Sequence, residues 1–163
     1  MMVDKGDEPQ LAYFNTARSH HVAAIALGNM NLSCAFPDLP VRQSLLIALE
    51  LYLKCWLLEN GVTKEQVRAF GHDLQTASER ARSLGLKFWG MDEELLQIIS
   101  QDKTLIEDRY IAPGKMRRVP NIEPMSELCD YFFEQCRDFC FNPDRPMFLT
   151  TRHFDRDKGS QRR

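Results

Sequence analysis

The chain has 163 residues, a formal net charge of −2 and an apolar fraction of 44%. This length suits one domain with one core, and a net charge close to zero excludes a global field that would attract nucleic acid or an acidic membrane. No apolar run approaches the ~20 residues that cross a bilayer, and the N-terminal segment MMVDKGDEPQ is too polar for a secretory signal. We therefore expect a cytoplasmic protein that does not enter a membrane.

Apolar residues recur at helical spacing along most of the chain, and no run alternates as a strand would. The pattern predicts an all-α fold, an up-and-down bundle of four or five helices. The expected elements are, in order, helices over about Pro9–Asn31 and Val41–Asn60, a short turn of helix from a cap at Thr63 to Ala69, and helices over about Asp73–Leu84, Met91–Ile106 and Met125–Phe141. The segment 107–124, with three prolines and a glycine, is expected to be irregular. We expect one helical domain over residues 1–141 and a polar, flexible tail over 142–163.

The helix after Val41 is apolar nearly all round, which is typical of a helix at the centre of a bundle. Two charged residues, Glu50 and Lys54, interrupt it. They are four residues apart and so lie on the same face, with the carboxylate on the N-terminal side where an ion pair is better oriented. We interpret them as a partly buried pair that helps to tie two helices together.

The five cysteines are odd in number and mostly lie in apolar helical pattern, which argues against a disulfide framework. Cys129, Cys136 and Cys140 fall on one expected helix, so two thiolates at a metal or redox site remain an alternative. The chain has no CxxC motif and no nearby histidine pair. Buried thiols packed in the core are therefore favoured, and no metal or cofactor is predicted.

Polar residues gather around the end of the central helix and the start of the next long one. Glu50, Lys54, Arg68, His72 and Asp73 lie there, and Arg109-Tyr110 follows later. A phosphate loop, a dinucleotide-binding glycine pattern and hydrolase motifs are all absent from the sequence. In a structural interpretation His72 and Asp73 cap a helix. In a functional one His72 presents its ring to an anion at that helix start.

The motif ALELYLK over residues 48–54, the helix stop Asn60-Gly61 and the later GHDL over residues 71–74 together resemble the HEPN domains, a "higher eukaryotes and prokaryotes nucleotide-binding" family. Arg109-Tyr110 and the last helix are similar to the second half of that family, so the resemblance covers roughly residues 40–140. It implies a helical bundle that often forms homodimers and occurs in prokaryotic toxin–antitoxin, phage-defence and RNA-processing systems. Active members of the family are metal-independent ribonucleases with an Arg and a His four to six residues apart on a late helix.

The sequence departs from the family at that signature. Arg68 and His72 have three residues between them and precede the third long helix, and the last helix has Arg137 but no histidine. A non-catalytic module that binds a nucleotide, RNA or a protein partner is therefore the favoured hypothesis. The expected binding residues are Lys54, His72, Arg109, Tyr110, Lys115, Arg117 and Arg118, the last three being a local basic cluster beside an aromatic residue.

Two alternatives remain open. The first is a metal-independent ribonuclease in which Arg68 and His72 are an atypical catalytic pair, the imidazole moving a proton and the cation stabilising charge on the phosphorane. The second is a module that only binds other proteins, through exposed aromatic residues such as Phe88 and Trp89. The solvated-loop interpretation of the basic cluster also stands beside its phosphate-binding one.

Overall fold

The computed structural model describes residues 9–101 and 121–140, and within these residues the chain is helical without strands. The described residues contain six helices: α1 (Pro9–Gly28), α2 (Leu39–Glu59), α3 (Lys64–Ala69), α4 (Leu74–Ser83), α5 (Gly90–Gln101) and α7 (Ile122–Cys140). The all-α bundle predicted from the sequence is confirmed. Among the described residues, no helix combines the length and the apolar character needed to cross a membrane.

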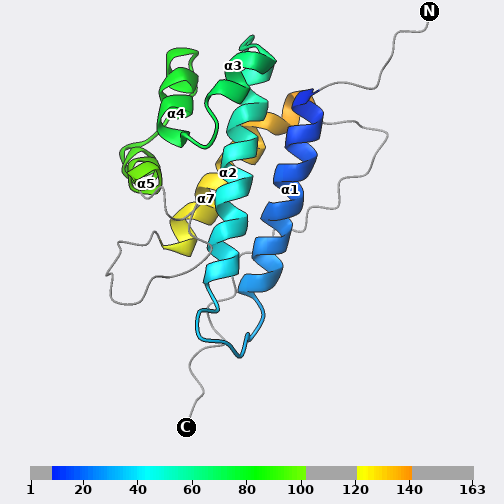
Figure 1. Ribbon diagram of the computed structural model, residues 1–163, viewed down its shortest axis with the longest axis vertical. Helices are drawn as coiled ribbons and strands as arrows, with labels where there is room; N and C mark the ends of the chain where they lie inside the picture. Colours follow the sequence, from blue (N-terminus) through cyan, green and yellow to red (C-terminus); the bar gives the residue numbers. More distant parts are fainter. Residues whose placement is uncertain (1–8, 102–120, 141–163) are drawn as a thin grey trace, which may run out of the picture.

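Helix α2 lies at the centre of the bundle, as its apolar circumference predicts. It packs antiparallel to α1 along most of its length, and it also contacts α7, α4 and α3 (Figure 1). Eleven of its residues are buried, from Val41 to Leu57. Because these side chains point in every direction around the helix, each neighbouring helix buries its own apolar stripe against α2.

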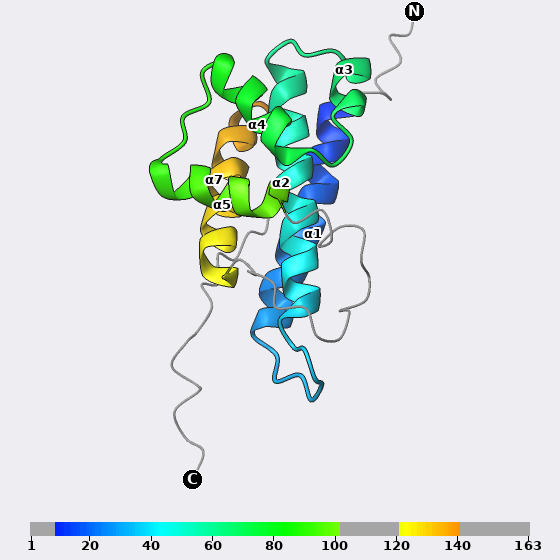
Figure 2. The same cartoon turned by 60° about the vertical axis from the view of Figure 1, so that its left-hand side comes forward.

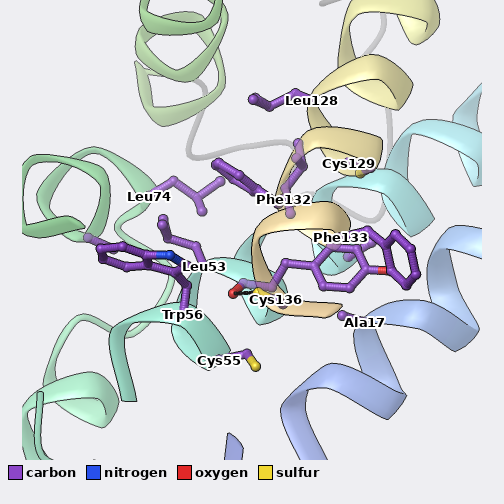
Figure 3. Packing of buried hydrophobic residues seen from close by; sticks show 14 of the residues in the cluster. Ala17, Leu53, Cys55, Trp56, Leu74, Leu128, Cys129, Phe132, Phe133 and Cys136 are labelled. Carbon is purple, nitrogen blue, oxygen red and sulfur yellow. Dashed lines mark hydrogen bonds between the residues drawn. The ribbon is translucent and has the colours of Figure 1, made fainter. Parts of the chain in front are cut away.

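Helix α7 runs parallel to α2 and therefore antiparallel to α1. Three contacts fix the register: the Cys129 thiol lies 3.6 Å from the Leu45 carbonyl, Cys136 lies 3.3 Å from the Tyr52 carbonyl, and the Cys140 and Cys55 sulfurs are 3.4 Å apart. Figure 3 shows the core between these helices, where Phe132 and Phe133 of α7 reach towards α4 and α1. Four of the five cysteines are thus core residues, as predicted, and Cys34 is exposed.

Short polar signals begin α3 and α4. Thr63 caps α3 through a complete capping box with Gln66, as its spacing predicts. Asp73 caps α4, its carboxylate accepting a hydrogen bond from the backbone N–H of Thr76 at 3.0 Å. Between the two helices the chain turns at Gly71, whose φ of +55° suits a residue without Cβ. In Figure 2, α3 and α4 lie beside the end of α2, and α5 follows below them.

Some helix boundaries differ from those expected. α1 ends at Gly28, three residues before the expected Asn31, and a closing turn follows it. α7 begins at Ile122 instead of Met125, so the expectation of irregular chain up to Pro124 is wrong for its last three residues. Pro124 falls in the first turn of α7, where a backbone N–H has no helical partner and proline is tolerated. The expected end of the fourth helix at Ile106, the rest of the irregular segment and the tail at 142–163 lie outside the described residues.

Candidate functional site

The carboxylate of Glu50 holds two basic side chains at once. Its Oε1 accepts a hydrogen bond from the Lys54 ammonium at 2.6 Å, and its Oε2 accepts one from His72 Nδ1 at 2.9 Å. The side chains of Glu50 and Lys54 are 12% and 11% exposed, whereas that of His72 is 68% exposed. We call these three residues the Glu50 triad. It has two members inside the protein and one on its surface.

Local sequence explains how the triad is assembled. Glu50 and Lys54 are one turn apart on α2, with the acid on the N-terminal side. The turn at Gly71 returns the chain to α2, and the cap at Asp73 fixes where α4 starts. His72 stands between these two residues. The Glu50–Lys54 pair therefore lies within one helix. The prediction that this pair ties two helices together is wrong, because the side chain that joins α2 to the α3–α4 turn is His72.

The arrangement decides which part of His72 is offered to a ligand. An ionised carboxylate only accepts hydrogen bonds, so Nδ1 carries the proton that Glu50 binds. Nε2 is then the ring nitrogen that can accept a proton or, in the imidazolium form, donate a hydrogen bond. Lys54 differs, since its ammonium is buried and its charge is balanced by Glu50. It therefore supports the site and offers little surface to a ligand.

The other predicted site residues are not joined to the triad. Arg68 is exposed on α3, and among the described residues no ion pair holds its side chain. Its carbonyl accepts the Gly71 N–H at 3.0 Å and so helps to close the turn before His72. Asp73 caps α4, as the structural interpretation predicts. The remaining predicted residues, Arg109, Tyr110, Lys115, Arg117 and Arg118, lie outside the described residues.

A second polar cluster lies between α1, α2 and α7. The buried His21 ring has Nδ1 at 3.4 Å from the Tyr52 hydroxyl and Nε2 at 3.5 Å from Asp130 Oδ1. Nε2 makes no hydrogen bond at that distance and geometry. Desolvation by burial lowers the pKa of His21 to about 4. Burial likewise raises the pKa of Tyr52, so both groups are neutral near pH 7. His21 shares the buried face of α1 with Phe14, Ala17 and Ala24, and this helical spacing does not identify a partner.

Metal binding finds no support in the described residues, where no group of three histidine, cysteine or acidic side chains is arranged around a common point. The sulfurs of α7 face the backbone and a thiol of α2 instead. Burial raises the pKa of Cys129 well above its ordinary value, which opposes the thiolate that a metal requires. The four buried thiols therefore have the character of core residues.

The two aromatic residues expected at a protein interface have different surroundings. Phe88 packs edge-on against Phe132, with ring centroids 5.9 Å apart, and belongs to the margin of the core. Trp89 is 61% exposed and meets Tyr131 edge-on at 5.1 Å. Of these two residues, Trp89 is therefore the one that presents a large apolar surface to solvent.

Family models, curated proteins and solved structures were all compared with the chain, and none matches it. The resemblance to HEPN domains thus stays a prediction from the sequence motifs.

Proposed function

We propose that the chain is a non-catalytic, HEPN-like helical module that binds a phosphate-bearing ligand, a nucleotide or RNA, at the exposed edge of His72. The observation that carries this proposal is the Glu50 triad, in which a mostly buried carboxylate fixes the orientation of a ring that is 68% exposed. A fixed imidazolium loses less side-chain entropy when it binds a phosphate oxygen than a freely rotating one does. Its charge also strengthens the hydrogen bond.

The surroundings of His72 favour binding over catalysis. Metal-free cleavage of RNA needs an imidazole and also a cation that stabilises charge on the phosphorane. The cation linked to His72 through Glu50 is Lys54, which is buried and balanced by that carboxylate. Arg68 belongs to α3 and takes no part in the triad. The second component of a catalytic pair is therefore not supplied by the triad itself.

The ribonuclease alternative keeps one specific observation in its favour. The hydrogen bond from Nδ1 of His72 to a carboxylate fixes the tautomer that leaves Nε2 able to accept a proton, as a general base must. In that second hypothesis Nε2 takes the proton of a ribose 2′-hydroxyl. Arg68, or a basic residue outside the described residues, supplies the positive charge.

One experiment tests both hypotheses. The full chain is titrated against fluorescein-labelled single-stranded RNA without metal, and binding is followed by fluorescence anisotropy while the same samples are run on a denaturing gel. We expect intact RNA and an affinity that falls about tenfold in His72→Ala, equivalent to about 1.4 kcal/mol. His20→Ala is the matched control, because it removes a histidine outside the triad. Competition with unlabelled ATP distinguishes a nucleotide site from an RNA site.

Each result decides something. Equal RNA affinity of the wild type and His72→Ala, together with no competition by ATP, would refute the binding proposal. Cleavage by the wild type that is abolished in His72→Ala would establish the ribonuclease instead.

The basic cluster gives a second, independent test of RNA binding. Changing Lys115, Arg117 and Arg118 together to alanine removes three charges that the sequence places beside Tyr110. If these side chains bind phosphates, the salt dependence of RNA binding becomes shallower by about 0.7 for each phosphate that is no longer neutralised. The control changes Lys158, Arg162 and Arg163, which removes the same charge from the tail. Equal salt slopes in the two triple variants would exclude the cluster from the binding surface.

A further inference from the structure

Two thiols that are far apart in the sequence meet at one end of the α2–α7 contact. The sulfurs of Cys55 and Cys140 are 3.4 Å apart and belong to residues separated by 85 positions. Cys55 is fully buried, and Cys140 is 7% exposed in the final turn of α7. The proposed ligand site gives these two thiols no chemical role.

We propose that Cys55 and Cys140 are an oxidation site, at which a hydroperoxide converts the two thiols into a disulfide that fixes the end of α7 to α2. A disulfide bond is about 2.0 Å long, so the sulfurs must approach by about 1.4 Å. Rotation of the Cys140 side chain in the last turn of its helix supplies this movement more easily than a shift of the central helix would. The proposal is independent of the function proposed for His72.

The reaction begins at Cys140. Cys140 is largely buried but keeps 7% of its surface exposed, whereas Cys55 is fully enclosed, so a small oxidant reaches Cys140 first. The pKa of Cys55 is raised, chiefly by a hydrogen bond with Cys136 and also by burial, so Cys55 stays protonated near pH 7 and reacts poorly with a peroxide on its own. Cys140 therefore takes the first oxidising equivalent, and Cys55 acts as the resolving thiol.

The atoms and electrons balance in two steps. The Cys140 sulfur attacks the peroxide, its S–O bond forms as the O–O bond breaks, and an alcohol, or water from hydrogen peroxide, leaves. Cys55 then attacks the resulting sulfenic acid, the S–S bond forms as the S–O bond breaks, and water leaves. The two thiols lose two electrons in all, and the hydroperoxide gains them.

The other cysteines provide the controls. Cys34 is exposed and would react by itself, so the test uses a Cys34→Ser background. Cys129 is buried on α7 with its thiol directed at the Leu45 carbonyl, so Cys129→Ser matches the loss of a core thiol without touching the pair. Cys136 is the competing partner, because it also neighbours Cys55.

Trypsin distinguishes the possible links. Cleavage after Lys54 and Lys64 isolates Cys55, and cleavage after Arg137 and Arg152 separates Cys140 from Cys136. The full chain with Cys34→Ser is treated with hydrogen peroxide, blocked with N-ethylmaleimide in denaturant, digested and analysed by mass spectrometry without reduction. We expect one link, between peptides 55–64 and 138–152, in a protein that runs as a monomer on a non-reducing gel. The link should persist in Cys129→Ser and disappear on treatment with dithiothreitol.

A second measurement keeps the test independent of how well the variants fold. Closing a long loop stabilises the folded chain, so the melting temperature of the oxidised protein should exceed that of the reduced protein by about 5 to 10 °C. This comparison uses one sequence in two redox states. A link from Cys55 to the peptide with Cys136, Cys140 recovered as sulfinic or sulfonic acid without a link, or equal melting temperatures would overturn the proposal.

Discussion

Two histidine–carboxylate contacts occur in the described residues, and their burial is opposite. In the first, His21 is buried and Asp130, 3.5 Å away, is about half exposed. In the second, the Glu50 side chain is mostly buried, at 12% exposed, and His72, 2.9 Å away, is mostly exposed. The same two kinds of side chain therefore produce two different surroundings for an imidazole.

The two contacts differ because the more buried side chain has different hydrogen-bond partners in each. The mostly buried Glu50 receives two hydrogen bonds, one from Lys54 and one from His72, so its desolvation is offset by charged and polar partners. Buried His21 has the Tyr52 hydroxyl at 3.4 Å and a carboxylate that keeps much of its water. Burial outweighs that carboxylate and lowers the pKa of His21 to about 4. One histidine is thus a neutral part of the core, and the other is a fixed group on the surface.

The largest expected effect comes from removing the Glu50 carboxylate, which binds both Lys54 and His72. Glu50→Ala leaves the Lys54 ammonium buried without its partner, and breaking a buried pair in this way costs about 3 kcal/mol. We expect the free energy of unfolding, measured with urea, to fall by about that amount. An unchanged midpoint would show that Lys54 reaches water and that the pair contributes nothing.

A double variant separates the unpaired charge from reduced packing. Glu50→Ala combined with Lys54→Met removes both charges and keeps an apolar chain in place of the lysine stem. It should recover more than half of the stability that Glu50→Ala removes, since no buried ammonium remains. Equal decreases in the single and the double variant would assign the effect to packing.

The second-largest expected effect concerns the His21–Asp130 contact, and it is measured as the change in stability with pH. Above pH ~6.5 His21 is neutral in both the folded and the unfolded chain and contributes nothing to pH dependence. Between that pH and the folded pKa of about 4, the unfolded chain binds a proton that the folded chain does not, so stability falls as the pH falls. The full decrease corresponds to about 3 kcal/mol.

The measurement compares urea unfolding at pH 7 and pH 4.5 in the wild type and in His21→Gln. Carboxylates titrate in both proteins, so the informative quantity is the difference between their two pH-dependent decreases in stability. We expect the decrease to be smaller in His21→Gln by about 2 kcal/mol. Equal decreases would mean that Asp130 stabilises the imidazolium enough to cancel the effect of burial.

Apolar periodicity and caps predicted most of the fold. The stripe of α2, the capping box at Thr63 and the stop before Gly61 are local signals, and the structure follows each of them. The predicted start of α7 at Met125 is wrong, because Pro124 fits the first turn of a helix as well as it fits irregular chain. Local rules place elements well where one short segment contains the whole signal.

The candidate site was only partly predictable for the same reason. The four-residue spacing of Glu50 and Lys54 shows their pairing directly. The contact of His72 with Glu50 depends on how the α3–α4 turn returns to α2, and the approach of His21 to Asp130 depends on how α1 packs against α7. These tertiary distances are not encoded in any local spacing. His21 on an apolar stripe was the available signal, and a stripe does not identify a partner.

The smallest expected effect concerns the turn that presents His72. Asp73 accepts hydrogen bonds from the Thr76 N–H at 3.0 Å and from the Thr76 hydroxyl at 2.7 Å. Asp73→Ala removes this N-cap and should cost about 1 kcal/mol in urea unfolding, whereas Asp73→Ser keeps a capping oxygen and should cost less. Equal costs for alanine and serine would show that the cap contributes little.

The same substitution shows whether the cap helps to hold the second contact together. Asp73 directly follows His72, so removal of the cap loosens the backbone that carries the imidazole to Glu50. In that case the costs of Asp73→Ala and Glu50→Ala are not additive, because either single variant already breaks the contact between His72 and Glu50. The double variant should then be more stable, by at least about 0.5 kcal/mol, than the sum of the two single costs predicts. The cycle of Asp73→Ala with His21→Gln is the control, and it should be additive since that contact lies between α1 and α7. Additivity in both cycles would mean that Glu50 holds the ring without help from the cap.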